Sequence, residues 1–378
     1  MKVTGIICEY NPFHKGHFKQ ISRIHANGSA VVCLMSGNFV QRGAPAIFDK
    51  SLRAKAAILA GTDLVLELPT TYALSSAEGF AAGGVKILSG FCDELSFGCE
   101  TADETTLMQT AQALLSPAFS DALRSHLDTG LSFPAARQAA LADLGWDASA
   151  LENPNDILAV EYCKAILSQQ SNMQPAPIRR EGNYHATLPD EENPSATAVR
   201  NLIMGDHDWK SCIPQAAWAA FEGADVHTLA FGENAVLARL RTMTDEEFEA
   251  LPYGSEGLWR KLMKNARSCA TLEEILTATK SKRYTRTRLD RMVMCAFLGI
   301  TGEMLESPTP YTRVLGFNDT GREILKKARL TGAFPHVGEA VDDPYWALEQ
   351  RWDDLYGLFA QTPSPAGGES KRRVYIAK

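Results

Sequence analysis

The sequence predicts an α/β fold in which a parallel, Rossmann-like sheet forms a first domain, residues 1–205, and a mainly α-helical domain, residues 206–378, follows it. Three observations support this prediction. Apolar runs alternate with helical patterns over roughly the first two hundred residues. These runs are apolar at nearly every position, which is typical of parallel strands covered by helices on both faces. After about Met204, strand patterns become scarce and helical patterns follow one another.

The elements of the first domain follow from local signals. An apolar run over 3–8 predicts the first strand, and Asn11 and Pro12 break the chain before a helix over 16–26. The helix over 50–60 has Asp49 as its N-cap and Gly61 as its terminator. The remaining strands are predicted at 30–35, 63–67, 94–97 and 176–179, and the remaining helices at 76–88, 157–169 and in a helical run through 104–143.

The second domain is predicted from helical spacing alone, apart from its last residues. The expected helices cover 216–222, 231–241, 245–251, 256–266, 271–278, 285–298 and 319–329. A loop rich in proline and glycine then leads to a short strand over 373–376. No internal repeat is evident.

Composition describes an ordinary globular protein, with 45% hydrophobic and 22% charged residues in 378. No apolar run reaches transmembrane length and no signal-peptide pattern is present, so we expect no membrane and a cytoplasmic location. The 8 cysteines form no CxxC pair, which favours reduced core thiols over disulfides or zinc ligands. A net charge of −7 argues against indiscriminate nucleic-acid binding but leaves room for a specific RNA partner.

The strongest chemical motif is the His-x-Gly-His run formed by His14, Lys15, Gly16 and His17 directly after the first strand. A helix N-terminus presents unpaired N–H groups to a phosphate, and Gly16 lets an oxyanion approach the backbone. His14 and His17 project to the same side and can donate to one phosphate as its charge grows. The alternatives are a chance pairing or half of a metal site. A zinc site needs further His or Cys ligands at short spacing, and none follow.

Two more loops, those that contain Gly37 and Gly98, follow predicted strands and so belong at the same edge of the sheet. The loop over 36–45 is long for a βα connection and carries Arg42, which favours a functional loop over a plain one. Gly98 either lets a nucleoside lie against the main chain or permits a turn. Asn155 lies at the start of the helix predicted over 157–169. Its amide either hydrogen-bonds to an adenine edge or caps that helix, and the sequence alone favours the cap.

A second phosphate-binding turn is predicted where Ser195 opens a helix that carries Thr197 and Arg200 in its first turns. An arginine near a helix N-terminus is mildly destabilising, but a polyphosphate bound there would make its charge stabilising. The order of the His-x-Gly-His run and this later turn resembles the two signatures of the nucleotidyltransferase superfamily. Members of that superfamily bind a nucleoside triphosphate and attack its α-phosphate.

A basic run over 280–291 holds six basic residues and one acid at the start of a predicted helix. Most such runs are solvated surfaces. Here cations sit at a helix start, where they are disfavoured, with an aromatic residue among them and in an acidic chain, which favours contact with RNA phosphates. The candidate RNA-binding residues are Lys282, Arg283, Arg286 and Arg288. The segment over 311–318 is a candidate extension of the same surface.

The whole chain resembles the bacterial tRNA(Met) cytidine acetate ligase family. The matching stretches are residues 9–17, 36–50, 61–69, 95–100, 154–162, 195–200, 281–289 and 311–318. The resemblance implies an ATP pocket formed by Ile7, Cys8, Glu9, Tyr10, Asn11, Pro12, Phe13, His14, Lys15, Gly16, His17, Phe18, Lys19 and Gln20, together with Gly98, Asn155 and Arg180. Arg179 directly precedes Arg180 and is the alternative at that position.

The resemblance implies an ATP-dependent ligase. It forms acetyl-adenylate from acetate and ATP and then acetylates N4 of the wobble cytidine of elongator tRNA(Met). His14 and His17 are the expected catalytic residues, Ser195, Thr197 and Arg200 are expected to hold the leaving pyrophosphate, and Mg²⁺ is expected to accompany ATP. No obligate protein partner is evident. The alternatives are an adenylyltransferase acting on a phosphorylated cofactor precursor and a tRNA-binding protein without catalysis.

Overall fold

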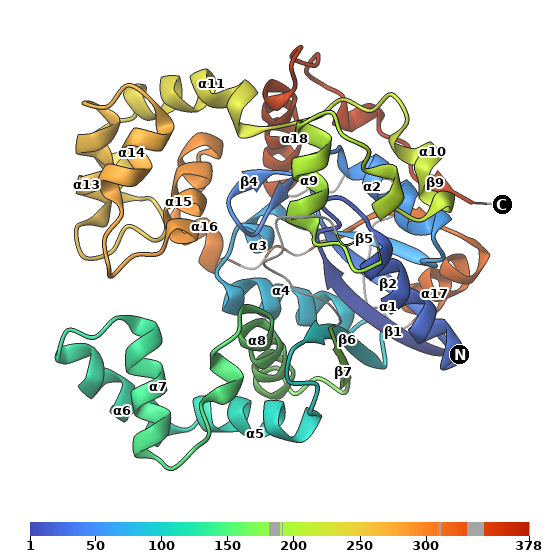
Figure 1. Ribbon diagram of the computed structural model, residues 1–378, viewed down its shortest axis with the longest axis horizontal. Helices are drawn as coiled ribbons and strands as arrows, with labels where there is room; N and C mark the ends of the chain where they lie inside the picture. Colours follow the sequence, from blue (N-terminus) through green and yellow to red (C-terminus); the bar gives the residue numbers. More distant parts are fainter. Residues whose placement is uncertain (181–189, 191, 308, 310, 331–343, 378) are drawn as a thin grey trace.

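One mixed sheet runs through the molecule. The computed structural model describes residues 1–180, 190, 192–307, 309, 311–330 and 344–377. Over these residues seven strands pair in the order β7-β6-β1-β2-β5-β8-β9 (Figure 1). Their bounds are β1 Lys2–Cys8, β2 Ser29–Ser36, β5 Leu64–Leu68, β6 Glu94–Cys99, β7 Gln174–Arg179, β8 Arg313–Phe317 and β9 Tyr375–Ile376. All neighbours are parallel except β5 and β8, which are antiparallel.

The central strands are apolar on both sides because helices cover both faces of the sheet. Every residue of β2 is buried. Val32 and Leu34 belong to a core cluster with residues of helices α4 (Ala77–Leu88) and α8 (Pro154–Ser168). Cys33 and Met35 belong to a second cluster, with residues of α1 (Lys15–Ala26) and α2 (Lys50–Leu59).

Helices make up the rest of the chain. Around the sheet lie α3 Thr70–Ala73, α5 Glu104–Leu114, α9 Ala196–Met204, α10 Trp218–Phe221, α17 Asp319–Leu330 and α18 Pro344–Tyr356. The pair α6 Pro117–Asp128 and α7 Phe133–Asp143 stands further from the sheet, beyond α5 (Figure 1). A helical lobe is formed by α11 Leu229–Thr242, α12 Asp245–Glu249, α13 Leu258–Ala266, α14 Leu272–Thr279, α15 Arg286–Leu298 and α16 Gly302–Glu306. A small hairpin pairs β3 Phe39–Val40 with β4 Ala44–Pro45.

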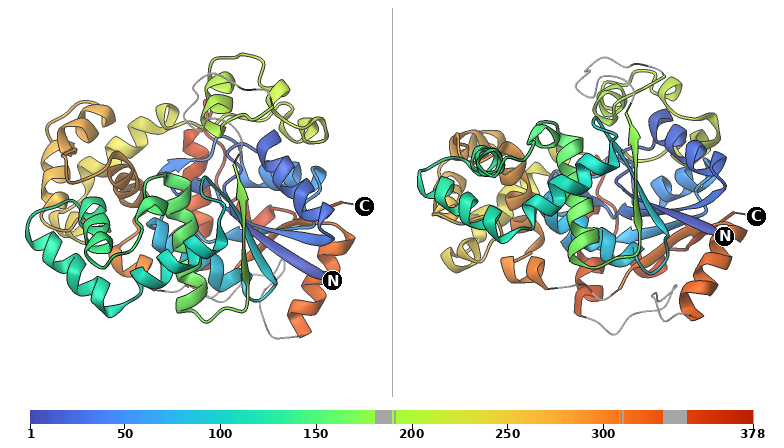
Figure 2. Two further views of the ribbon diagram at one scale, coloured as in Figure 1. Left: turned by 60° about the horizontal axis from the view of Figure 1, so that its bottom comes forward. Right: turned by 90° about the horizontal axis from the view of Figure 1, so that it is seen from below.

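The helical lobe has a hydrophobic core of its own. Val236, Leu262, Ile275 and Met292 are buried together there, away from the two clusters that flank the sheet. The lobe and the pair α6–α7 project from the same side of the molecule (Figure 2). Among the described residues, no helix has both the length and the apolar character needed to cross a membrane.

The predicted fold class is confirmed, because a largely parallel sheet comes first and the second part of the chain is mostly helical. The predicted strands of the first part are present, and Asp49 caps α2 by accepting from the Ser51 N–H. All eight cysteines are among the described residues and carry free thiols.

Three expectations need correction. The helical run through 104–143 is three helices, because Ser116 and Ser132 each begin a new helix with proline in its first turn. Five features were not predicted from the sequence: α3, α16, α18, β8 and the β3–β4 hairpin. The segment over 311–318, expected on an RNA surface, contains β8, which is mostly buried and pairs with β5. Since β8 and β9 complete the sheet, the division at 205 and 206 does not separate the sheet from the second part of the chain.

Candidate active site

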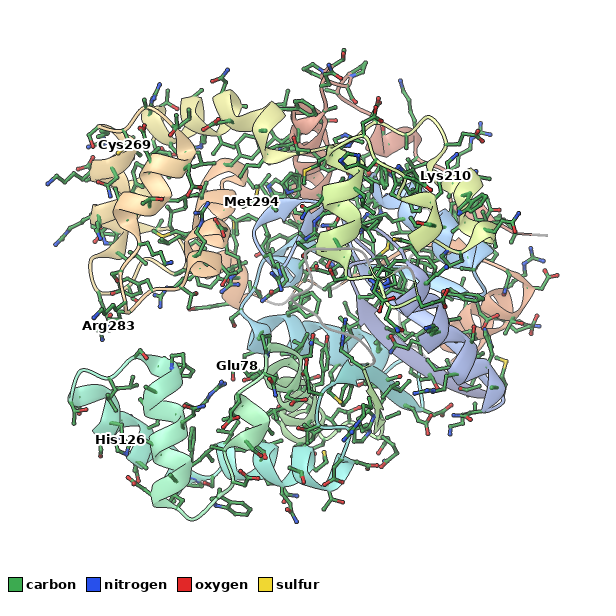
Figure 3. All side chains as sticks on the ribbon, viewed as in Figure 1. Glu78, His126, Lys210, Cys269, Arg283 and Met294 are labelled. Carbon is green, nitrogen blue, oxygen red and sulfur yellow. The ribbon has the colours of Figure 1, made fainter. Side chains whose placement is uncertain are left out.

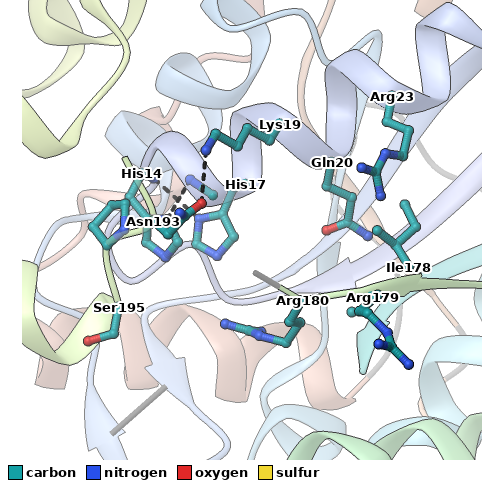
Figure 4. Close-up of a pocket in the computed structure, with 13 residues that line it drawn as sticks. His14, His17, Lys19, Gln20, Arg23, Ile178, Arg179, Arg180, Asn193 and Ser195 are labelled. Carbon is teal, nitrogen blue, oxygen red and sulfur yellow. Dashed lines mark hydrogen bonds between the residues drawn. The ribbon is translucent and has the colours of Figure 1, made fainter. Parts of the chain in front are cut away.

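A pocket lies at the ends of β6 and β7, beside the N-terminal half of α1 and the start of α9 (Figure 4). It is lined by His14, Gly16, His17, Lys19, Gln20, Arg23, Gly98, Ile178, Arg179, Arg180, Asn193, Pro194 and Ser195. The lining brings together the His-x-Gly-His run, the glycine after β6, the paired arginines and the later serine. The sequence predicted these segments separately, and the structure places them around one pocket.

His14 and His17 cap the helix that they begin. His14 is the N-cap of α1, and its Nδ1 accepts from the Gly16 N–H at 3.1 Å. Nδ1 of His17 accepts from the His14 N–H at 3.2 Å, so the two imidazoles form a reciprocal capping box. Their rings are stacked with centroids 3.6 Å apart. Because Nδ1 is an acceptor in both rings, each neutral imidazole carries its proton on Nε2.

Both imidazoles are neutral near pH 7. Burial, together with the charges of Arg180 and Arg200, lowers the pKa of His14 to about 3. Burial, His14 and Arg180 lower the pKa of His17 well below its ordinary value. Each ring is therefore an uncharged N–H donor before any ligand enters.

Gly16 is required by the cap itself. A Cβ on Gly16 would lie 2.9 Å from Cε1 of His14, too close for the ring to stay in place. The sequence interpretation gave Gly16 the role of letting an oxyanion approach. The cap adds a second reason for glycine at this position.

The two predicted phosphate-binding turns meet. Ser195 caps α9 by accepting from the Ala198 N–H at 3.0 Å, and it also lines the pocket with His14. Arg200 donates to the main-chain carbonyl of Asn11 at 2.7 Å and to Oγ1 of Thr197 at 3.1 Å. Arg200 therefore ties the start of α9 to the turn before α1. Thr197 and Arg200 stand beside the pocket rather than in its lining.

Arg53 holds the loops that follow β1 and β2 and was not predicted as a site residue. It is fully buried on α2 and donates to the carbonyls of Glu9 at 2.5 Å, Ser36 at 3.1 Å and Phe48 at 2.9 Å, and also to that of Gly37. A basic residue on an otherwise surface-like stretch of helix gives no sequence signal of such a role.

The remaining residues of the predicted ATP segment have different places. Lys19 donates to Oδ1 of Asn193 at 2.8 Å, and Gln20 donates to Oγ of Ser96 at 3.2 Å. The apolar members lie in the core beneath the pocket, and these are Ile7, Cys8, Tyr10 and Phe13. Glu9, Asn11 and Pro12 belong to the loop before α1, outside the lining. Lys15 is the first residue of α1 and is also outside the lining, and Phe18 is exposed on α1. Arg23, Ile178, Asn193 and Pro194 line the pocket without having been predicted.

The loop over 36–45 links the two parts of the chain. It forms the β3–β4 hairpin, and its Gln41 N–H donates to Oε1 of Glu9 at 2.7 Å. Gly43 has φ of 76° and packs so closely on the backbone of Arg291 in α15 that a Cβ would overlap it. The hairpin thus contacts both the loop before α1 and the helical lobe.

At the β6 side of the pocket, Gly98 leaves room for Arg180, whose Cγ would lie 3.1 Å from a Cβ there. Arg179 and Arg180 both line the pocket. Asn155 is not the N-cap of α8, because Asn153 takes that position. Nδ2 of Asn155 instead donates to Oε1 of Glu100 at 2.6 Å. Residues 181–189, which directly follow Arg180, lie outside the described residues.

The predicted RNA-binding residues lie at the start of α15, on the helical lobe. Figure 3 shows Arg283 at the edge of this lobe, away from the sheet. Arg283 pairs with Glu256 at 2.6 Å, and Arg286 pairs with Glu273 at 2.7 Å and Asp290 at 2.8 Å. Arg288 donates to the carbonyl of Tyr253 and stacks over Tyr284, whereas Lys282 is exposed. The cluster is thus partly neutralised by acids of its own lobe.

Comparison with known proteins adds four findings. A family model described as HIGH Nucleotidyl Transferase matches residues 1–371. A tRNA(Met) cytidine acetate ligase from Clostridium acetobutylicum is 35% identical over 372 residues, covering 92% of each chain. The crystal structure of Thermotoga maritima TmcAL in its apo form superposes with a TM-score of 0.91 at 30% identity, over 100% of this chain and 99% of that one. The same protein bound with alpha-thio ATP superposes with a TM-score of 0.87 at 29% identity and equal coverage.

Proposed function

The chain belongs to the tRNA(Met) cytidine acetate ligase family of HIGH nucleotidyl transferases, and from that premise we propose that it activates acetate with ATP and acetylates a cytidine of tRNA(Met). The observation that carries the proposal is the reciprocal histidine cap facing a cationic pocket, with the serine of α9 across from it. We assign the acetyl acceptor as N4 of the wobble cytidine of the elongator tRNA.

In the first step a carboxylate oxygen of acetate attacks the α-phosphorus of ATP, and the bond from that phosphorus to pyrophosphate breaks. Nε2 of His14 and Nε2 of His17 donate to the α-phosphate oxygens as their charge grows. Both nitrogens already carry protons, so no proton transfer is needed before attack. Acetate is a weak nucleophile, so alignment of the two reactants supplies much of the rate.

Pyrophosphate leaves toward the start of α9. The N–H groups there, with Ser195, Thr197 and Arg200, favour an anion. Of the described residues that line the pocket, Lys19, Arg23, Arg179 and Arg180 add positive charge and none is a carboxylate. This charge offsets the repulsion between acetate and the triphosphate.

We include Mg²⁺ as an ion that enters with ATP. The described residues around the pocket do not fit a protein-bound Mg²⁺, because they offer no carboxylate ligand. Nor does any group of three His, Cys, Asp or Glu side chains in the described chain suit a metal ion. An ion would therefore be held by phosphate oxygens and water.

In the second step the cytidine amine attacks the acetyl carbonyl, loses a proton, and adenosine monophosphate leaves. We assign delivery of the tRNA to residues 206–378, with contact through the cluster Lys282, Arg283, Arg286 and Arg288. Residues 1–205 then hold the ATP site. We expect the reaction in the cytoplasm, where ATP and tRNA meet.

The test is exchange of labelled pyrophosphate into ATP without tRNA. We expect exchange that depends on acetate. Exchange driven by phosphorylated cofactor precursors but not by acetate would point to an adenylyltransferase. No exchange with any carboxylate, combined with tRNA binding, would point to a non-catalytic tRNA-binding protein.

A further inference from the structure

Glu100 stands one residue beyond β6 and has one oxygen without a partner. Its Oε1 accepts from Nδ2 of Asn155 at 2.6 Å. Its Oε2 is buried and has no hydrogen-bond donor among the described residues. Buried polar atoms are nearly always paired, because an unpaired one costs about 1–3 kcal/mol. Oε2 can therefore accept a hydrogen bond from a donor on a ligand.

The carboxylate is held firmly in this position. Oδ1 of Asp156 accepts from the N–H groups of Glu100 and Thr101, both at 2.8 Å. Asp156 is fully buried at the start of α8, so helix and strand end are joined at this point. A group fixed by its own main chain and by Asn155 is preorganised for recognition.

The position adjoins the candidate nucleotide pocket. Gly98 lines that pocket two residues before Glu100. The Arg180 N–H donates to the carbonyl of Cys99 at 3.0 Å, and Arg180 also lines the pocket. Glu100 thus lies next to the β6–β7 side of the pocket, just outside its lining, whereas Ser195 lines the pocket from the start of α9.

We propose that Oε2 of Glu100 accepts a hydrogen bond from the nucleoside of ATP, which makes Glu100 a determinant of nucleotide specificity. The proposal rests on the proposed function, since it assumes that ATP occupies this pocket. An ionised carboxylate only accepts, so the ligand must bring a donor and not a phosphate oxygen. The adenine 6-amino group and the ribose hydroxyls share this chemistry.

Glu100→Gln tests the idea with little change of volume, because an amide accepts through one oxygen only. Glu104→Gln is the matched control, since Glu104 is exposed at the first position of α5 and its loss removes the same charge. ATP affinity is measured by calorimetry for the wild type and both variants. We expect Glu100→Gln to bind ATP about 10- to 100-fold more weakly, as for a lost charged hydrogen bond, and Glu104→Gln to match the wild type.

Three analogues locate the donor: purine riboside triphosphate, which lacks the 6-amino group, 2′-deoxyATP and 3′-deoxyATP. We expect the wild type to bind one of these analogues more weakly than it binds ATP. Glu100→Gln should bind that same analogue with the affinity of the wild type. If Glu100→Gln weakens the binding of ATP and of all three analogues by the same factor, Glu100 only supports Asn155. That result would overturn the proposal. Unchanged ATP affinity in Glu100→Gln would overturn it as well.

Two further measurements keep the outcomes distinct. Thermal unfolding of Glu100→Gln without nucleotide reports on folding. If that variant does not fold, Glu100→Asp, which keeps both acceptor oxygens, is used in its place with the same expected results. Acetate-dependent pyrophosphate exchange by the wild type reports separately on the proposed function. ATP binding that follows the analogue pattern without any exchange would uphold Glu100 and reject the acetate reaction.

Discussion

The capping box of α1 uses two imidazoles where serine or threonine and glutamate are usual. In each ring Nδ1 accepts a hydrogen bond from the backbone, which leaves Nε2 for a ligand in the pocket. The side chains that cap the helix are thus the same ones to which we assign donation to the phosphate. Mutations at His14 or His17 to alanine would mix a loss of stability with a loss of chemistry, because both functions share one ring.

The double change His14→Asn with His17→Gln separates these roles. Asparagine is a strong N-cap, and glutamine completes a capping box at the third helical position. We expect unfolding in urea to change by less than about 1 kcal/mol, whereas acetate-dependent pyrophosphate exchange falls 100-fold or more. Near-normal exchange in this variant would remove the histidines from the proposed mechanism.

Stability should depend on pH through His14. Its pKa is about 3 in the folded state and about 6.5 when unfolded, so the unfolded chain takes up the proton first as pH falls. Folding stability due to His14 is therefore fully present above 6.5 and decreases below it, by about 1.4 kcal/mol per pH unit. Urea unfolding of the wild type and of His14→Asn at pH 7, 6 and 5 measures this. The two stability curves should diverge on acidification, and parallel curves would contradict the assignment.

The same shift predicts the pH profile of the reaction. The profile of kcat/KM reports on the free enzyme, in which both imidazoles are neutral. We expect kcat/KM for ATP in the exchange assay to show no histidine inflection between pH 5.5 and 7.5, roughly one unit either side of the ordinary value. A fall in kcat/KM centred near 6.5 would show that one imidazole must titrate.

At the scale of elements, Arg200 joins α9 to the turn before α1. Arg200→Lys keeps the charge but loses the planar fork that reaches both Asn11 and Thr197. We expect about 10-fold weaker exchange with a larger effect on KM than on kcat, because the two turns would grip the triphosphate less well. Arg241→Lys, whose contacts are to carbonyls in the helical lobe, is the matched control.

The segment that leads into α15 and the start of that helix form the element to which we assign tRNA binding. Lys282→Ala with Arg283→Ala should weaken tRNA binding and lower the slope of log affinity against log salt by about one for each lost phosphate contact. Arg286 and Arg288 are left intact because they are half-buried and hold acidic and main-chain partners of the lobe, whereas Arg283 is exposed although it pairs with Glu256. Arg267→Ala serves as control, and exchange without tRNA should stay normal in all of these variants. An unchanged salt slope would place the RNA contact elsewhere.

At the scale of the whole molecule, the sequence predicted the strands up to β7 and the short terminal strand β9, but it missed β8, which joins β9 to the sheet. Continuous apolar runs signal parallel strands, whereas β8 is a five-residue segment interrupted by Gly316, and its pairing with β5 depends on contacts far along the chain. The site was predicted where residue types carry the chemistry, as for His14 and Ser195. Arg53 and Glu100 could not be found, because only the fold shows that one is buried and the other has an unpaired oxygen.

Buried charge connects the last residues to the sheet. Lys50 is fully buried and pairs with Glu67 of β5 at 2.7 Å, Glu369 at 3.1 Å and Asp353 of α18 at 3.3 Å. Removing one member of such a group leaves unpaired charge in the core. We expect Lys50→Met to lower the free energy of unfolding by about 3–5 kcal/mol in urea. Lys371→Met, an exposed lysine nearby, should change it by less than about 0.5 kcal/mol.

The crossing of β8 and β9 back into the sheet has a consequence for biosynthesis. While the ribosome is still making the helical lobe, β5 is the outer strand of a half-built sheet and offers its hydrogen-bonding groups to any neighbour. The nascent chain is therefore exposed to intermolecular pairing at β5 until β8 emerges and covers that strand, and β8 in turn stays the outer strand until β9 pairs with it.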